Sequence, residues 1–203
     1  MNYGIDSTKK WVFVNGIYPG ANNQICGHMQ LFNLEKRQDQ KLDGGFCAAF
    51  TDMPVSDTVT HKNSLFCFAQ RKVGENTTKL HIMEIGNPAP GAQKLKQQAD
   101  IQMQDGDFPV LMHDSAKYGC LFIVTKMGFV YMYEVSTASL LFRQQLTDQL
   151  CFVATRNPNT DGMLIINKAG QIFMLNVDEN VLVQYVANSA HIPNNKDLSF
   201  KLA

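Results

Sequence analysis

The octapeptide Gly128-Phe129-Val130-Tyr131-Met132-Tyr133-Glu134-Val135 is one of four copies of a short pattern in this chain. The other three are Gly27-His28-Met29-Gln30-Leu31-Phe32-Asn33-Leu34, Thr78-Lys79-Leu80-His81-Ile82-Met83-Glu84-Ile85 and Gly170-Gln171-Ile172-Phe173-Met174-Leu175-Asn176-Val177. The last residues of successive copies are 51, 50 and 42 residues apart. This period is close to the roughly 40 to 50 residues of a four-stranded propeller blade. The chain is therefore predicted to be an array of similar β units, a class of fold that usually binds rather than catalyses.

A second apolar run precedes each copy and does not alternate apolar with polar residues. These runs are Trp11-Val12-Phe13-Val14, Leu65-Phe66-Cys67-Phe68-Ala69, Leu121-Phe122-Ile123-Val124 and Met163-Leu164-Ile165-Ile166. A strand of this composition is covered on both faces. Each run is expected to form a hairpin with the copy that follows it. Gly128 and Gly170 supply positive φ in the short turns, whereas the first loop is expected to extend from Asn15 to Gly27 and the second to hold Gly74 and Asn76.

Two further kinds of strand are expected around each hairpin. More polar runs suit the outermost position, where one strand edge faces water: Leu95-Lys96-Gln97-Gln98, Leu140-Leu141-Phe142-Arg143-Gln144 and Val181-Leu182-Val183-Gln184-Tyr185. Small or apolar runs suit the innermost position around a central channel: Ala48-Ala49-Phe50-Thr51, Phe108-Pro109-Val110-Leu111-Met112 and Cys151-Phe152-Val153-Ala154.

The predicted fold class is all-β, with three and a half to four blades of four antiparallel strands followed by a short α-helical linker. The propeller is expected over residues 1–186 and the start of the linker over residues 187–203, where Asp197 to Ala203 reads as a capped helix. An open array would expose a broad apolar sheet face at each end. The chain is therefore expected to be part of a longer protein or to close with a partner, and the first reading is favoured.

Composition excludes several function classes. The 203 residues carry 18 basic and 18 acidic side chains and no Lys/Arg block, which disfavours binding to a nucleic acid or an anionic membrane. No apolar segment reaches the 18 or so residues of a membrane helix. The five cysteines are an odd number, are widely spaced and include no Cys-x-x-Cys pair, so a reducing, cytoplasmic location without a disulfide framework is expected.

The same stretches closely resemble the N-terminal terminal domain of clathrin heavy chains. The stretches that carry the resemblance are 11–17, 27–32, 46–50, 64–69, 79–86, 107–110, 122–128 and 167–171. The resemblance is collinear over nearly the whole chain from about Asn2. It implies a partial seven-bladed β-propeller that holds part of the fourth blade, the fifth to seventh blades and the start of the linker toward the coat leg.

The resemblance also implies a non-enzymatic function. The chain would be a structural subunit of the clathrin coat that docks adaptor peptide motifs during endocytosis and intracellular vesicle transport. Its expected partners are adaptor and arrestin-type peptides, with clathrin light chains and other heavy chains reached through the absent leg. No nucleic acid and no direct membrane insertion are expected. The implied location is the cytoplasmic face of coated pits and vesicles, at the plasma membrane and trans-Golgi network.

The resemblance further implies a peptide groove between the fourth and fifth blades, which an arrestin loop occupies in the family. By position its wall would include Trp11, Leu31, Lys36, Arg37, Gln38 and Gln40. Gln38 stands where the family tends to have an apolar residue. The groove for the clathrin-box peptide lies between the first two blades, which this chain would lack. An extended peptide would press alternate apolar side chains into such a groove.

Alternative functions remain open at this point. A generic WD-type propeller scaffold for protein interactions is one alternative, although the Gly-His and Trp-Asp marks of that class are missing. A propeller hydrolase or dehydrogenase is the other. No catalytic set, no phosphate-binding glycine loop or other cofactor site and no metal-ligand spacing among the histidines is recognisable in the sequence.

Overall fold

The computed structural model describes residues 1–21, 24–52, 64–86 and 93–188. Four antiparallel sheets follow one another along the chain, and each is formed by strands that are consecutive in sequence. The first sheet contains β1 (Asn2–Ile5), β2 (Trp11–Pro19), β3 (Ile25–Asn33) and β4 (Gln38–Asp43). The second contains β5 (Gly45–Thr51), β6 (Leu65–Gln70), β7 (Thr78–Glu84) and β8 (Lys96–Ile101). The third contains β9 (Pro109–Ser115), β10 (Cys120–Thr125), β11 (Phe129–Glu134) and β12 (Leu140–Gln145). The fourth contains β13 (Cys151–Asn157), β14 (Gly162–Asn167) and β15 (Ile172–Leu175), and α1 (Glu179–Asn188) follows it.

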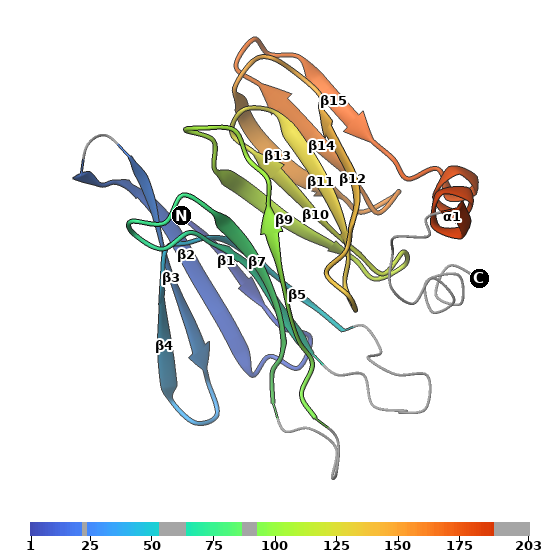
Figure 1. Cartoon of the computed structure of the whole chain (residues 1–203). Helices are drawn as coiled ribbons and strands as arrows, with labels where there is room; N and C mark the ends of the chain where they lie inside the picture. Colours follow the sequence, from blue (N-terminus) through green and yellow to red (C-terminus); the bar gives the residue numbers. More distant parts are fainter. Residues whose placement is uncertain (22–23, 53–63, 87–92, 189–203) are drawn as a thin grey trace.

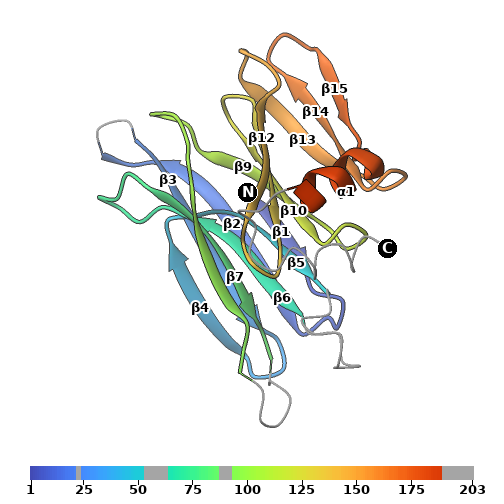
Figure 2. The same ribbon diagram turned by 45° about the vertical axis from the view of Figure 1, so that its right-hand side comes forward.

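The four sheets lie side by side as the blades of a propeller. Figures 1 and 2 show the second and third sheets between the first and the fourth. The first strands of the sheets, β1, β5, β9 and β13, contact one another in that order, so they form the inner side of the arc. The four copies of the sequence pattern coincide with the third strands β3, β7, β11 and β15. The predicted all-β, partial-propeller fold class is therefore confirmed.

One hydrophobic cluster fills each junction between neighbouring sheets. Phe13 and Phe66 belong to the cluster between the first and second sheets, Leu80 and Tyr131 to that between the second and third, and Met163 to that between the third and fourth. Strands β6 and β10 are buried on both faces, as their unbroken apolar runs predicted. The second strands of the end sheets, β2 and β14, instead include alternating buried and half-buried residues. The burial pattern of the second strands therefore distinguishes the middle blades from the end blades.

The hairpin turns agree with the prediction at three of four places. Gly128 and Gly170 adopt φ of +83° and +81° in the short turns, and the second loop holds Gly74 with φ of +85°. The prediction of a first loop from Asn15 to Gly27 is wrong, because β2 continues to Pro19 and β3 begins at Ile25. Paired polar and apolar residues extend this ladder well into the stretch expected to be a loop. Strands β1 and β4 were not predicted either, since both are short and polar or partly exposed.

The prediction of an outermost strand at Val181 to Tyr185 is wrong, because these residues lie in α1. Asp178 explains the helix: its Oδ1 accepts hydrogen bonds from the backbone N–H of Asn180 at 3.0 Å and of Val181 at 3.2 Å, as an N-cap does. Leu182 is buried against the cluster between the third and fourth sheets. Among the residues that the structure describes, the fourth sheet therefore has three strands. The helix expected at Asp197 to Ala203 lies outside the described residues, and the domain boundary near Ala187 stays a prediction.

Candidate functional site

The predicted peptide-binding residues lie on the first sheet and the turn at its end. Trp11 opens β2, Leu31 lies in β3, and Gln38 and Gln40 lie in β4. The register pairs Trp11 with Asn33 and Asn33 with Gln38. It also pairs Phe13 with Leu31 and Leu31 with Gln40. Because paired residues share a face and residues two apart along a strand share it too, Trp11, Leu31, Gln38 and Gln40 all lie on one face.

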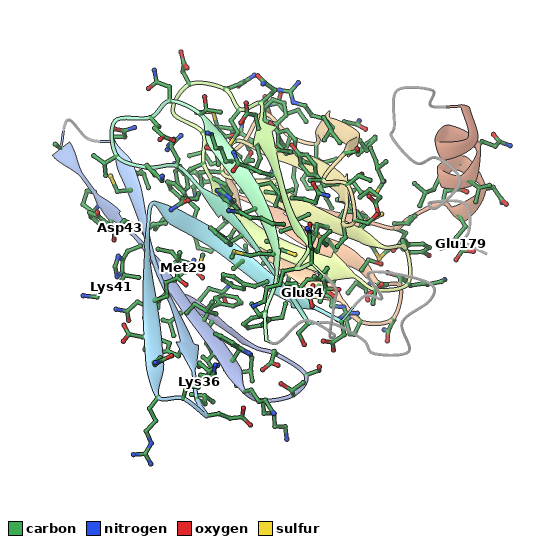
Figure 3. The ribbon with its side chains drawn as sticks, turned by 60° about the horizontal axis from the view of Figure 1, so that its bottom comes forward. Met29, Lys36, Lys41, Asp43, Glu84 and Glu179 are labelled. Atoms are coloured by element: carbon green, nitrogen blue, oxygen red, sulfur yellow. The ribbon has the colours of Figure 1, made fainter. Side chains whose placement is uncertain are left out.

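This face is the one that packs on the second sheet. Leu31 is buried in the cluster between the two sheets, and Trp11 is half-buried against the same cluster. Gln38 and Gln40 lie on the outermost strand and are exposed. The predicted residues thus run from a buried apolar floor to a solvated amide rim at the junction of the first and second sheets. Figure 3 places Met29, which is fully buried in this cluster, on the side toward the second sheet, and Lys41 on the opposite side.

The second sheet supplies the opposite wall of this junction. Phe50, Phe66 and Phe68 face the first sheet, and Met83 packs against the same cluster. The ring of His81 stacks on Phe68 with 4.7 Å between ring centroids. None of these residues was predicted for the site. Their two-residue spacing along β5, β6 and β7 assigns each to one face of its strand, but it does not say which sheet that face meets.

The surroundings of His81 favour the neutral form of its imidazole. Partial burial and the positive charges of Lys79, Lys72 and Lys96 lower its pKa below the usual value. A neutral ring can stack on an aromatic neighbour and still offer one donor and one acceptor to a ligand. His81 is therefore suited to contact a peptide backbone at this junction.

Two hydrogen-bonded turns hold the candidate residues in place. The buried carboxyl of Asp6 accepts hydrogen bonds at Oδ1 from the backbone N–H of Trp11 at 2.7 Å and of Lys10 at 2.8 Å. These bonds fix the start of β2 and thus the position of the indole. At the other turn, Oδ1 of Asn33 accepts a bond from the backbone N–H of Lys36 at 2.8 Å.

The turn between β3 and β4 presents a positive rim. Arg37 adopts φ of +50°, so the chain reverses sharply there. Lys36 and Arg37 are exposed, and Lys36 is labelled near the end of this hairpin in Figure 3. An apolar floor with an amide and cationic rim is suited to bind an extended segment with apolar side chains and carboxyl or carbonyl groups.

A second concave feature lies between the third and fourth sheets. A cavity of about 230 Å³ is lined almost entirely by apolar groups of Phe122, Met132, Leu141, Leu175 and Leu182 together with their neighbours. Helix α1 forms one side of it through Val181 and Leu182. Sequence reasoning missed this cavity because it expected a strand where α1 lies.

The described residues were compared with the requirements of a metal site and of a membrane helix. Within the described ranges, no group of three or more His, Cys, Asp and Glu side chains is arranged to hold a metal ion. Among the same residues, no helix combines the length and apolar character of a membrane span.

No family model matches the chain. Whole-length matches exist among curated proteins. The chain is 34% identical over 207 residues to "Probable clathrin heavy chain 1" of Caenorhabditis elegans. It is 32% identical over 212 residues to "Clathrin heavy chain 2" of Oryza sativa subsp. japonica and 32% identical over 209 residues to "Clathrin heavy chain 2" of Homo sapiens. Each match covers 100% of this chain and 12% of the relative, so the chain spans a small part of their length.

Solved structures share the fold alone. Chaetomium thermophilum Sqt1 bound to the N-terminus of the ribosomal protein L10 superposes with a TM-score of 0.55 at 11% identity. The match covers 92% of this chain and 46% of that chain. A second Sqt1 structure gives a TM-score of 0.55 at 10% identity and covers 92% and 44%.

The stacked antiparallel sheets, three of four strands and one of three, define the described chain as a segment of a β-propeller. The curated matches point to one family: over its whole length the chain is similar to a part of clathrin heavy chains. The resemblance seen in the sequence is thereby confirmed, and the matches are consistent with its terminal-domain segment.

Proposed function

We propose that this chain is a structural, non-enzymatic segment of a clathrin-type coat and that it docks extended peptides at the junction of its first and second sheets. The whole-length match to clathrin heavy chains carries this proposal. By this reading the chain acts on the cytoplasmic face of coated pits and vesicles, in endocytosis and intracellular vesicle transport. Adaptor and arrestin-type peptides are the partners of the junction, and light chains and other heavy chains meet the rest of the coat protein.

The arrangement of the junction supports the choice of site. Trp11 and Leu31 form an apolar floor, and exposed Gln38 and Gln40 offer amide donors and acceptors beside it. Lys36 and Arg37 add positive charge at the turn. An extended peptide could insert alternate apolar side chains at the floor while the rim bonds its backbone. Single-site binding of this kind is weak and is strengthened when many copies assemble in a lattice.

The test uses the single tryptophan of the chain as a reporter. Trp11 is the sole Trp, so its fluorescence reports directly on the candidate site. An arrestin-loop peptide is titrated into the purified chain, with a clathrin-box peptide as the comparison. The arrestin-loop peptide is expected to change the Trp11 emission saturably, and the clathrin-box peptide is expected not to bind. Capture of the clathrin-box peptide would contradict the blade assignment.

Variants sharpen the same test. Replacing both Gln38 and Gln40 with Ala should weaken binding of the arrestin-loop peptide while leaving the fold intact, because both side chains are exposed. Gln144→Ala is the matched control, since Gln144 is an exposed glutamine on the outermost strand of the third sheet. Equal affinities for all three proteins would refute docking at this junction.

A further inference from the structure

The wall that the second sheet contributes to the peptide junction carries basic side chains as well as aromatic ones. His81 of β7 pairs with Phe68 of β6, which faces the first sheet. Because paired residues share a face and residues two apart along a strand share it too, His81 and Lys79 both face the first sheet. The pairing of Met83 with Lys96 of β8 places Lys96 on this face as well. Lys96 is exposed, and Lys79 and His81 are half-buried.

The lysine and arginine side chains at this junction form no ion pairs among the described residues. Lys79 and Lys96 form none there, although Asp100 lies opposite Lys79 in the ladder of β7 and β8. Lys36 and Arg37, at the turn of the first sheet, are exposed and form none within the described ranges. The whole chain has 18 basic and 18 acidic side chains, so this concentration of positive charge is local. Such a surface attracts ligands of the opposite charge.

His81 is the group on this wall whose charge can respond to a ligand. Its ring stacks on Phe68, and no described residue forms a hydrogen bond with either ring nitrogen. Burial, followed by the positive charges of Lys79, Lys72 and Lys96, lowers the pKa of His81 in the free protein. A carboxylate placed beside this ring would offset those charges and favour the protonated imidazole. The ring would then donate a charge-assisted hydrogen bond to the carboxylate.

We infer that His81 and Lys96 bind a carboxylate side chain, so that the junction selects extended peptides in which Asp or Glu flanks the apolar residues. This inference rests on the proposed docking of peptides at the junction and specifies the chemistry of the peptide. Packed sheets lie about 10 Å apart, so one extended peptide can reach both walls. Its apolar side chains contact the floor at Trp11 and Leu31, while its carboxylate lies against β7 and β8.

Three matched peptides test this selectivity. They share one set of leucines and carry Glu, Gln or Lys at the flanking positions. Calorimetry measures the affinity of each peptide for the 203-residue chain, and the emission of Trp11 reports whether the peptide occupies the junction. The Glu peptide should bind about three- to ten-fold more tightly than the Gln peptide, and the Lys peptide should bind most weakly. The advantage of the Glu peptide should shrink at about 0.5 M salt.

The outcomes separate this inference from the docking proposal on which it rests. Equal affinities of the Glu and Gln peptides, with a saturable Trp11 response to both, would overturn the selectivity and leave docking at the junction intact. Failure of all three peptides to bind would refute docking and the selectivity together.

A lysine variant identifies the wall that holds the carboxylate. Lys96→Gln should lower the ratio of Glu-peptide to Gln-peptide affinity about two- to three-fold. Lys41→Gln is the matched control, because Lys41 is an exposed lysine of the outermost strand β4 and lies on the side away from the second sheet (Figure 3). Circular dichroism checks that both variants keep their β structure. An equal fall in the two variants would show that overall charge sets the preference, and would contradict a contact with Lys96.

The pH dependence of the same ratio isolates His81. Because a bound carboxylate favours the protonated ring, binding of the Glu peptide takes up a proton, and the ratio should be higher at pH 5.5 than at pH 7.5. The charged groups around His81 are of types that do not titrate over this interval: Lys72, Lys79, Lys96 and Asp100 on the second sheet and Lys36 and Arg37 on the first.

The comparison contains its own control. The carboxyls of the Glu peptide stay ionised at pH 5.5, since the usual pKa of glutamate is about 4.3. Both peptides bind the same protein, so titration of its other histidines cancels in the ratio. His81→Gln should make the ratio the same at both pH values. A ratio that does not change with pH in the original chain would contradict a contact between the carboxylate and His81.

Discussion

Leu31 lies directly opposite Gln40 in the ladder between β3 and β4, and the two side chains point to the same face of the first sheet. Leu31 is 6% exposed, whereas Gln40 is exposed at the outer strand. The face thus changes from buried and apolar to solvated and polar between two adjacent strands. A ligand that follows the outer strand would therefore contact both an apolar floor and an amide rim.

Replacement of Gln38 by an apolar residue should strengthen peptide docking at this junction. Gln38 lies in the same row as Trp11 and is exposed, so Gln38→Val would extend the apolar floor at little cost to the fold. A gain of about 0.5 to 1 kcal/mol corresponds to an affinity increase of roughly two- to five-fold. Titration with the arrestin-loop peptide measures it. Gln144→Val is the control, and an equal gain in that variant would show that the effect is nonspecific.

Loss of the carboxyl of Glu134 should destabilise the third sheet strongly. Glu134 is fully buried, and its oxygens accept hydrogen bonds from the backbone N–H of Ser136 at 2.9 Å and of Thr137 at 2.6 Å. The hydroxyl groups of Ser136 and Thr137 also donate hydrogen bonds to the Glu134 carboxylate, each at 2.6 Å. Because Glu134→Ala leaves these donors without their acceptor, the free energy of unfolding should fall by about 2 to 4 kcal/mol. Urea unfolding measures the difference.

The control for this change is Glu35→Ala. Glu35 forms an exposed ion pair with Lys10 at 2.9 Å, with side chains 59% and 50% exposed. Exposed pairs contribute about 0 to 1 kcal/mol, so this variant should unfold nearly as the original chain does. Similar losses for the two glutamate variants would argue that the turn bonds of Glu134 contribute little.

Addition of one methyl group at Gly162 should be poorly tolerated. A Cβ at this position would lie 1.9 Å from the backbone oxygen of Leu175, which cannot move without breaking the pairing of β14 with β15. Gly162→Ala is expected to lower the free energy of unfolding by more than about 2 kcal/mol. Gly16→Ala is the matched control, because no atom lies within 4 Å of its Cβ position, and a change within about 0.5 kcal/mol is expected.

Stability should decrease as the pH falls below the usual pKa of histidine, in part because of His113. Its side chain is buried and stacks on Phe122 with 6.0 Å between ring centroids. Burial is the main cause that lowers the pKa of His113 from 6.5, with Arg156 acting in the same direction and Asp114 and Asp161 opposing it. Below pH 6.5 the unfolded chain therefore binds more protons at this residue than the folded chain does, which favours unfolding.

His113→Gln should flatten this pH dependence. The denaturant midpoint is compared between pH 7.5 and pH 5.5 for the original chain and the variant, and the variant should lose less stability over this interval. His81 has a pKa lowered in the same direction, so the His81→Gln/His113→Gln double variant should flatten the dependence further. An unchanged slope in both variants would contradict this assignment.

One cysteine should react much faster than the other four. Cys47, Cys67, Cys120 and Cys151 are buried, whereas Cys26 is only partly buried. Burial raises the pKa of the Cys47, Cys67 and Cys151 thiols, so little nucleophilic thiolate forms there. An aromatic disulfide reagent should modify about one thiol rapidly in the folded chain and all five in denaturant. Cys26→Ser should abolish the rapid phase, and its persistence would show that another thiol is accessible.

Much of the fold could be predicted because the pattern of each blade is local. The copies at 27–34, 78–85, 128–135 and 170–177 coincide with strands β3, β7, β11 and β15. Gly128 and Gly170 take the positive φ expected of their turns. Strands β1 and β4 escaped prediction because their residues are mostly exposed and lack an apolar pattern. The prediction of a strand at Val181 to Tyr185 was wrong because an apolar run of that length is compatible with either a strand or a helix. The hydrogen bonds that Asp178 accepts at the start of this run favour the helix.

The amino-acid sequence alone determined the repeat, the strand order within the second and third blades and the resemblance to clathrin heavy chains, because these depend on residues that are close along the chain. The tertiary structure decided which sheet faces meet. Only the packing of the first sheet on the second brings Trp11 and Leu31 opposite Phe68 and Met83. It also leaves the outer faces around Ile5 and Ile172 exposed. The physical reason is that two-residue alternation assigns a side chain to a face, whereas the neighbour of that face is set by the placement of whole sheets in space.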